Sequence, residues 1–345
     1  MATIKDVAKA AGVSVATVSR VLNTSENVRP DTVEAVQRAI EELDYHPNFL
    51  GRTLRRLETM KILVIVPTIS NQFYSRVIRG IQSVAHQNGY HVMLAITESG
   101  LDSEQEYVQM AQRKLVDGII FLHSTLEPER INELADSCPV VCANEYIPHT
   151  KLSVVSIDNV QAGYDATSFL LENGHRSIAF VSASSLYSSS ALRRDGYLKA
   201  MAEWGISAEE SWFLNEGLTF KAGRRAADRL LQMENLPDAV FAASDSAAIG
   251  LISALSGHGI QAGKDISIMG FDNNQIAEYY IPALTTVSQP QMEIGQKAME
   301  LLINKIQNPS CEPQRVTLPH RLEIRASVRL APSRPAREKE RKIHP

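Results

Sequence analysis

Residues 3–23 contain two short helical patterns separated by a tight turn, and this feature constrains the N-terminal fold more than any other. Thr3 can cap a first helix, and Gly12 ends it because glycine tolerates left-handed backbone angles. Ser14 can cap a second helix. The apolar positions recur at three- and four-residue spacing, at Ile4, Val7, Ala8, Ala11, Val15, Val18, Val21 and Leu22. The pattern is typical of a helix-turn-helix, whose second helix enters the major groove of DNA; an ordinary corner of a helical bundle is the alternative.

A third helix is predicted over residues 30–43, with Pro30 in its first turn and Val33, Val36, Ile40 and Leu43 on its apolar face. It completes a small all-α headpiece over residues 1–46. The segment that follows is basic, and on composition alone it is a flexible linker.

The string from Thr3 to Asn23 closely resembles the N-terminus of the lactose-repressor (LacI/GalR) family of bacterial transcription regulators. The match continues through Val28-Arg29-Pro30-Asp31-Thr32 and Leu43-Asp44-Tyr45-His46-Pro47-Asn48, and further matches extend to about residue 330. The resemblance implies a sequence-specific regulator, a repressor, whose operator affinity is controlled by a small-molecule effector. It also implies a homodimer that binds a near-palindromic operator on double-stranded DNA.

On the second helix, the family positions that face bases are occupied here by Val15, Ala16 and Arg20. Arg20 can pair bidentately with guanine O6 and N7, whereas Val15 and Ala16 offer apolar contact only. Taken alone, Arg20 would be a solvated helix charge. The resemblance implies further DNA contacts, mostly to phosphates, at Thr3, Ser14, Thr17, Ser19, Asn23 and Tyr45.

Residues 47–60 correspond to the family's hinge helix, which forms on DNA and inserts a leucine into the minor groove. Leu54 matches that leucine, and Arg55 is a neighbouring DNA contact. The sequence departs from the usual pattern at Gly51, where alanine is common. Glycine in a helix costs ~1 kcal/mol relative to alanine, so we expect a hinge that folds reluctantly.

From Lys61 onward, strands and helices alternate, which implies parallel sheets covered by helices on both faces. Strands are predicted at 62–66, 92–96, 118–122, 139–143, 154–157, 178–183, 239–244 and 266–271. Helices are predicted at 74–88, 103–114, 161–173, 190–204, 220–233, 246–257 and 290–306. The pattern restarts near Gly174, which indicates an α/β core of two doubly wound lobes with a ligand cleft between them.

The resemblance implies that residues 61–330 form a bilobed, periplasmic-binding-protein-like core for effector binding and dimerisation, with a chain that crosses between the lobes several times. It assigns effector contacts to Phe73, Tyr74, Ser124, Asn144, Arg193, Leu218 and Asp272. Residues 331–345 are charged, and we expect a disordered tail rather than a further DNA contact.

The residue types of the predicted cleft suit a flat, hydroxylated ligand. The aromatic side chains can stack on a base or sugar face, and Arg193 with Asp272 can bind hydroxyl groups. Alternatives remain: Phe73 in the core, Asp272 as a helix cap, and Arg194 in place of Arg193. Asp158 and Asp245 also follow strands, and we interpret them as hinge or capping residues.

Two further segments, Asn144-Glu145-Tyr146 and Ser156-Ile157-Asp158-Asn159, resemble the subgroup that contains the cytidine and purine repressors. A nucleoside, cytidine or another, is therefore the first expectation for the effector, and a sugar is the second. No other cofactor is expected.

Composition bounds the other function classes. The chain has 345 residues, a net charge of -4 and three cysteines, which indicates no disulfide framework and no metal-ligand spacing. No apolar run reaches membrane-spanning length and no signal region begins the chain, so we expect a cytoplasmic protein. An overall acidic charge does not suggest DNA binding, but the predicted DNA-facing segments are locally basic, at Arg20, Arg29, Arg52, Arg55 and Arg56.

Two rival classes of protein are disfavoured. An enzyme on a Rossmann-like fold would show a glycine-rich dinucleotide fingerprint, a phosphate loop or a paired nucleophile and base, and none follows the predicted strands. A solute-binding transport protein with the same bilobed core would carry a signal peptide in place of residues 1–56.

Overall fold

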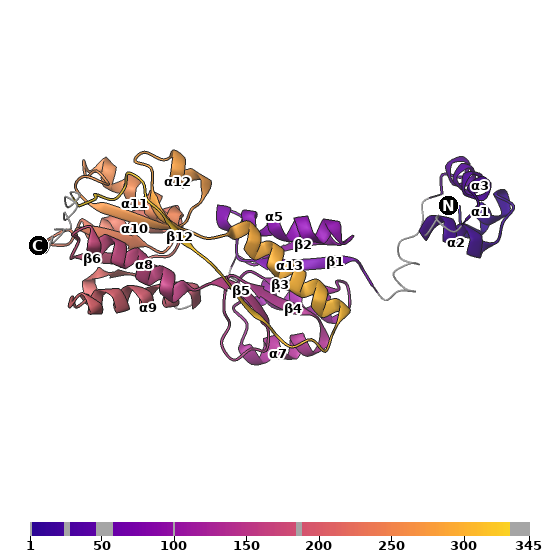
Figure 1. Cartoon of the computed structure of the whole chain (residues 1–345), viewed down its shortest axis with the longest axis horizontal. Coiled ribbons are helices and arrows are strands. Elements are labelled where there is room, and N and C mark those ends of the chain that lie inside the picture. Colours follow the sequence, from indigo (N-terminus) through magenta and orange to yellow (C-terminus); the bar gives the residue numbers. More distant parts are fainter. Residues whose placement is uncertain (1, 24–27, 46–57, 99–100, 184–187, 332–345) are drawn as a thin grey trace, which may run out of the picture. The chain divides into compact units, whose positions relative to one another are not determined.

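The computed structural model describes residues 2–23, 28–45, 58–98, 101–183 and 188–331. It separates into two units, Met1–Thr59 and Met60–Pro345, which are drawn in Figure 1. The predicted hinge residues Gly51, Leu54 and Arg55 lie outside the described residues, as does the predicted tail from residue 332.

The first unit contains the three predicted helices, α1 (Ile4–Ala10), α2 (Val15–Asn23) and α3 (Pro30–Glu42). The Asp6 carboxylate accepts hydrogen bonds from the Thr3 backbone N–H (2.8 Å) and hydroxyl (2.7 Å), which fixes the start of α1. Gly12 has a φ of 66°, and the Ser14 hydroxyl accepts from the Thr17 N–H at 3.1 Å. The turn therefore forms as its sequence predicts.

The first lobe of the second unit, here called the N-lobe, is a parallel sheet in the order β11-β5-β4-β3-β1-β2. Its strands are β1 (Lys61–Val66), β2 (His91–Ile96), β3 (Gly118–Phe121), β4 (Val140–Ala143), β5 (Ser153–Ile157) and β11 (Arg315–Leu318). Along β1, Ile62 and Val64 pack on one face and Leu63 and Ile65 on the other. Helices α5 (Gln72–Gln87) and α13 (Gln291–Gln307) cover the first face, and α6 (Leu101–Gln112) and α7 (Pro128–Ser137) cover the second.

The second lobe, the C-lobe, is a sheet in the order β12-β10-β9-β8-β6-β7, in which only β12 runs antiparallel among the described strands. Its strands are β6 (Ile178–Val181), β7 (Phe213–Leu214), β8 (Ala239–Ala242), β9 (Ser267–Asp272), β10 (Thr285–Ser288) and β12 (Arg321–Glu323). Its helices are α8 (Asn159–Glu172), α9 (Ser188–Glu203), α10 (Phe220–Leu230), α11 (Asp245–Gly257), α12 (Gln275–Tyr279) and a 3-10 turn, Glu210–Trp212. Helices α8 and α9 pack on one face of this sheet, and α10 and α11 on the other. The predicted fold class is confirmed.

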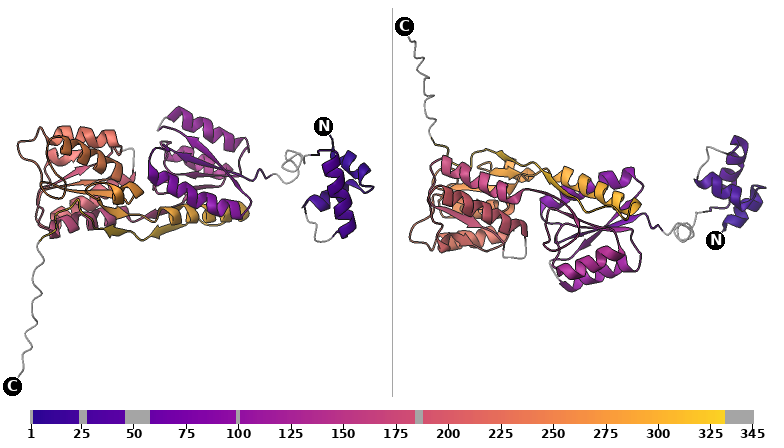
Figure 2. Two further views of the ribbon diagram at one scale, coloured as in Figure 1. Left: turned by 90° about the horizontal axis from the view of Figure 1, so that it is seen from above. Right: turned by 60° about the horizontal axis from the view of Figure 1, so that its bottom comes forward.

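The chain crosses between the lobes three times, from β5 to α8, from β10 to α13 and from β11 to β12. Figure 2 shows the late helix α13 lying beside the early helix α5. The predicted restart near Gly174 is therefore too late, because α8 already belongs to the C-lobe. The prediction also omitted the ten-residue helix α7 within the N-lobe, as well as α12, β7, β10, β11 and β12, which are short or lie at the crossings.

Helices α8 and α9 meet backbone to backbone through two glycines. A Cβ at Gly196 would stand 2.0 Å from the Val160 carbonyl oxygen, and one at Gly163 would stand 2.3 Å from the Arg193 carbonyl oxygen. Glycine at both positions is therefore what allows α9 to lie this close to α8. The two glycines therefore also set the position of Arg193, which lies on α9.

Replacing Gly196 with alanine should force the two helices apart and lower the free energy of unfolding of the second unit by about 1–3 kcal/mol or more. Urea unfolding followed by circular dichroism measures this change. Gly257→Ala is the matched control, because the new Cβ would meet nothing within 4 Å. It should leave stability unchanged or raise it slightly. Equal losses in both variants would refute the packing explanation.

Candidate functional site

The carboxyl ends of the strands of both lobes border a small cavity of about 20 Å³. Six of the seven predicted effector residues line it: Phe73, Tyr74, Asn144, Arg193, Leu218 and Asp272. The seventh, Ser124, does not, because its hydroxyl bonds to the Glu104 carboxylate within the N-lobe. A larger cavity of about 400 Å³ adjoins it and shares Asn71, Tyr74 and Leu218 with it. The role of these residues in effector binding stays a prediction.

The aromatic residues stand at the start of α5. The Asn71 side chain accepts a hydrogen bond from the Phe73 N–H at 3.0 Å and so caps this helix. The Phe73 and Tyr74 rings meet edge to face with their centroids 5.4 Å apart. Both rings are buried in the N-lobe core and also border the cavity. Phe73 is therefore both a core residue and a residue of the cavity wall.

Arg193 is the cation of the cavity, and only 3% of it is exposed. Its Nε donates to Asn159 Oδ1 (2.9 Å) and its Nη1 to the Ala243 carbonyl (2.7 Å), while the guanidinium lies 3.6 Å from the centre of the Phe271 ring. Burial lowers the pKa of Arg193, and the nearby carboxylates of Asp272 and Glu145 oppose this. Arg194 instead lies over the Phe213 ring and does not line the cavity.

Asp272 ends β9 with a φ of 118°, a left-handed angle that costs free energy for a residue with a Cβ. Its carboxylate accepts from Gln289 Nε2 at 2.8 Å, and its carbonyl accepts from Gln291 Nε2 at 2.6 Å. Burial raises the pKa of Asp272 to about 7, with Arg193 and the Gln289 hydrogen bond acting in the opposite direction. Asp272 does not cap α12, because Asn274 is the residue that precedes that helix.

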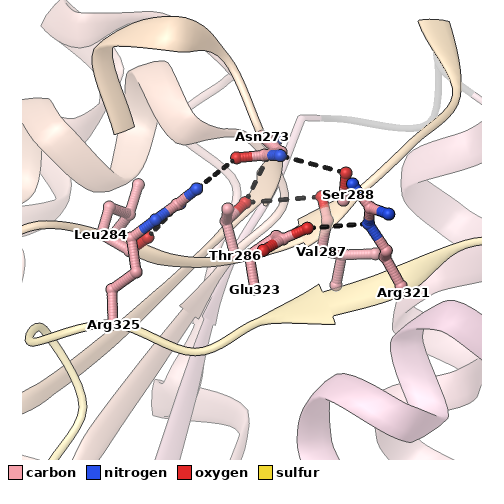
Figure 3. Close-up of polar contacts among 8 residues, drawn as sticks. All are labelled: Asn273, Leu284, Thr286, Val287, Ser288, Arg321, Glu323 and Arg325. Carbon is pink, nitrogen blue, oxygen red and sulfur yellow. Dashed lines mark hydrogen bonds and ion pairs between the residues drawn. The ribbon is translucent and has the colours of Figure 1, made fainter. Parts of the chain in front are cut away.

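Asn273, the residue after Asp272, is held by its own side-chain hydrogen bonds. Figure 3 shows that the Asn273 side chain accepts from Arg325 Nη2 (2.8 Å) and donates to the Ser288 hydroxyl (3.1 Å). Asn273 also has a positive φ, of 55°. These bonds tie the strained turn to β10 and to the segment that follows β12, so the Asp272 carboxylate has a fixed position.

Two further acidic residues have structural roles. Asp158 caps α8 by accepting from the Gln161 N–H at 2.9 Å, as interpreted from the sequence. Asp245 is fully buried and accepts from the Asn274 N–H (2.6 Å) and the Thr286 hydroxyl (2.5 Å). Burial and the neighbouring Asp272 raise the pKa of Asp245.

Glu145 and Ser189 also line the cavity, and sequence reasoning did not select them as site residues. Both are buried, at 3% and 4% exposure. The available signal was an acidic residue two positions after a predicted strand, together with a run of serines just before a predicted helix. Their proximity depends on how the lobes face each other, which local sequence patterns do not report.

In the first unit, three predicted base-reading side chains, Val15, Ala16 and Arg20, are exposed on α2. Arg20 makes no hydrogen bond or ion pair with the other described residues. Tyr45 is only 9% exposed and packs in the core with Val7, Val18 and Val36. Of the other predicted contacts, Thr3 and Ser14 act locally as caps, and Ser14 also bonds to the Thr17 hydroxyl.

Nothing within the described ranges points to metal or membrane chemistry. No group of three or more His, Cys, Asp or Glu side chains in these ranges could hold a metal ion. The cysteines Cys138, Cys142 and Cys311 are unpaired thiols. The helices in the same ranges are too short or too polar to span a bilayer.

Comparison with known proteins settles the family. Residues 3–48 match the bacterial regulatory proteins of the lacI family, and residues 167–328 match the periplasmic binding protein-like domain. The chain is 37% identical to the catabolite control protein A of Priestia megaterium over 329 residues, which are 95% of this chain and 99% of that protein. The chain belongs to the lacI family. It is therefore a DNA-binding transcriptional regulator under the control of a small-molecule effector, as the sequence predicted.

Other lacI-family proteins show similar agreement over the whole chain. The transcriptional repressor CytR of Escherichia coli is 36% identical over 96% of this chain and 97% of its own length. The lac repressor dimer bound to operator and the anti-inducer ONPF superposes with a TM-score of 0.84 at 26% identity, covering 95% of this chain and 99% of that one. The complex of the regulator CelR with cellobiose superposes with a TM-score of 0.72 at 31% identity, covering 95% and 100%.

The raised pKa of Asp272 has a measurable consequence. Because the pKa rises from 3.8 to about 7, the folded chain holds a proton that the unfolded chain releases between these pH values. The stability that this proton contributes is present at low pH and is lost as the pH rises to 7, with a slope of up to about 1.4 kcal/mol per pH unit. Asp272→Asn should flatten this part of the profile, as measured by urea unfolding from pH 4 to 8. Parallel profiles for the two proteins would contradict the assignment.

Proposed function

We propose that this chain is a homodimeric, cytoplasmic repressor that binds a near-palindromic operator and is controlled by an uncharged nucleoside, or secondarily a sugar, bound between its lobes. In this proposal it has no enzymatic activity and no cofactor. The observation that carries the proposal is the convergence of Phe73, Tyr74, Asn144, Arg193 and Asp272 on one interlobe cavity.

The charges around the cavity favour an uncharged effector. Arg193 is the one cation that lines it within the described residues, and it faces the buried carboxylates of Asp272 and Glu145. A phosphorylated ligand would add negative charge to a site that already has excess acceptors. Hydroxyl or amino groups would instead donate to these carboxylates, and the Phe73 and Tyr74 rings offer apolar surface for a base or sugar face.

The adjoining 400 Å³ cavity supports an effector larger than the inner cavity alone would hold. Its apolar wall includes Tyr74, Leu218 and Phe220, and its polar wall includes Asn71 and Asn215. A nucleoside has two parts, a hydroxylated sugar and a flat base, which suit a polar inner site and a mixed outer one. The CelR relative binds cellobiose, a sugar, in a complex of the same fold, which keeps a sugar as the second candidate.

Exposed apolar side chains on both lobes support a homodimer. Tyr279 is 71% exposed and Ile281 89% exposed in the C-lobe, while Leu94 and Ile96 are exposed on the edge strand β2 of the N-lobe. Each pair is two residues apart in the sequence, and a contiguous exposed apolar patch marks a protein interaction site. The lac repressor with the same fold is a dimer on its operator.

DNA recognition by α2 predicts a specific effect of Arg20→Ala. Loss of one bidentate contact to guanine should weaken binding to an operator selected from random DNA by about 1–3 kcal/mol, and it should relax the preference at one base position. Arg38→Ala is the matched control, because Arg38 lies on α3 in an exposed ion pair with Glu34 at 3.0 Å. This substitution should change the free energy of operator binding by less than about 1 kcal/mol. Fluorescence anisotropy measures both, and indistinguishable affinities would exclude base reading by Arg20.

Effector binding is tested by thermal shift with nucleosides, sugars and their phosphorylated counterparts. We expect an uncharged compound to raise the melting temperature, since a ligand at 100 times its dissociation constant adds about 2.7 kcal/mol of stability. Arg193→Lys, which keeps the charge but loses the planar fork, should abolish the shift. Arg194→Lys should retain it, because Arg194 lies outside the cavity. A phosphorylated compound that outperforms its neutral partner would refute the proposed effector class.

A further inference from the structure

The Glu145 carboxylate forms hydrogen bonds that join the two lobes. Glu145 follows β4 in the N-lobe and is 3% exposed. Its Oε2 accepts from the Ser188 hydroxyl (2.6 Å) and the Ser189 N–H (3.0 Å), and its Oε1 accepts from the Ser189 hydroxyl (2.5 Å). Both serines begin α9 in the C-lobe. Within its own lobe, the carboxylate accepts only a long bond from Asn144 Nδ2, at 3.4 Å, among the hydrogen bonds of the described residues.

The physical setting makes these bonds strong. Hydrogen bonds to an ionised acceptor are shorter and stronger than neutral ones, and the low dielectric of a buried site strengthens them further. The N-terminus of a helix carries a partial positive charge, which stabilises a carboxylate placed there. The 16-residue helix α9 presents this end to Glu145. If the lobes separated, the Glu145 carboxylate would enter water and lose its bonds to Ser188 and Ser189 at the same time.

The same link connects the predicted effector residues of the two lobes. Asn144, directly before Glu145, lines the cavity from the N-lobe, and Arg193, on the second turn of α9, lines it from the C-lobe. Two further interlobe bonds are single and neutral: the Gln275 N–H donates to Gln72 Oε1 at 2.8 Å and joins α12 to α5, and Gln291 Nε2 of α13 donates to the Asp272 carbonyl of β9 at 2.6 Å. The Glu145 carboxylate therefore provides the strongest of these connections.

We propose that Glu145 is a positioning residue that fixes the angle between the lobes by binding the first turn of α9. The inference deepens the proposed function and rests on it, because the lobe angle is what an effector in this cleft would have to keep or change. The bonds to Ser188 and Ser189 are therefore part of the regulatory equilibrium as well as of the static packing.

Glu104 supplies a matched control. It is 1% exposed, and its carboxylate accepts from the Ser124 hydroxyl, the Thr125 N–H (2.9 Å) and the Thr125 hydroxyl (2.8 Å). The bond types are those of Glu145, but all the partners lie in the same lobe. Removing the Glu104 carboxylate should cost stability without releasing one lobe from the other.

The lobe angle can be measured without effector or DNA. Spin labels at Glu129→Cys on α7 and Lys221→Cys on α10 place one probe on an exposed position of each lobe. Cys311→Ser removes the partly exposed native thiol, while Cys138 and Cys142 are buried and stay unlabelled. Pulsed electron double resonance on the full chain, diluted with unlabelled chain, then gives the interlobe distance distribution.

Glu145→Ala should lengthen and broaden this distribution, and Ser188→Ala combined with Ser189→Ala should do the same from the opposite side. Glu145→Gln should stay close to the parent chain, because its amide oxygen still accepts from the Ser189 N–H. Glu104→Ala should leave the distribution unchanged.

An unchanged distribution in the serine double variant, or an equal shift in Glu104→Ala, would overturn the proposal. The serine variant decides the outcome even if Glu145→Ala does not fold. Since no ligand is added, failure to find an effector among nucleosides and sugars would refute the proposed function without affecting this result.

Discussion

The cleft depends on one constraint of parallel sheets: every strand delivers its carboxyl end to the same edge. Asn144 follows β4, Ala243 follows β8 and Asp272 ends β9, so side chains far apart in sequence meet at two facing edges. Backbone groups at such edges have lost their ladder partners, and they bind side chains instead. The Ala243 carbonyl, for example, accepts from Arg193 Nη1. The site is therefore made of groups that the sheets leave available.

Arg193 shows how a charge is kept inside such a site. Desolvation opposes burying a guanidinium, and the structure offsets this cost with the Asn159 oxygen, the Ala243 carbonyl and the face of the Phe271 ring. Asp272 is held in a strained turn by amides from Gln289 and Gln291. Both ionisable groups thus have fixed positions that come from the protein itself, which is the preorganisation that selective binding requires.

Local patterns predicted most of the fold. Gly12 and Ser14 predicted the turn of the headpiece. The alternation of strands and helices after Lys61 predicted the two doubly wound lobes, because a parallel strand buried on both faces is a continuous apolar run. The strands at the crossings were missed, since β11 and β12 are short and half exposed. Lobe membership was misjudged at α8 because periodicity does not report which sheet a helix covers.

The site was predicted unevenly for the same reason. Six cleft residues followed from the resemblance: Asn144 and Asp272 at strand ends, Phe73 and Tyr74 at the start of α5, Arg193 on the second turn of α9, and Leu218 before α10. Ser124 does not line the cavity, and its hydroxyl bonds instead to the Glu104 carboxylate on a different element of the N-lobe. Glu145 was missed because its partners Ser188 and Ser189 belong to the other lobe, and only the three-dimensional arrangement brings them together.

The crossings also explain why events in the cleft would reach the rest of the molecule. Gln289 lies between β10 and α13 and Gln291 is the first residue of α13, yet both hold Asp272 in the cavity. His320, in the segment between β11 and β12, bonds to Asp165 of α8 at 2.9 Å. A rotation of the lobes about these segments must therefore move the groups that position the site. Coupling free energies between sites are typically about 1–3 kcal/mol, the size of one or two charge-assisted hydrogen bonds, so links of this kind are sufficient to carry regulation.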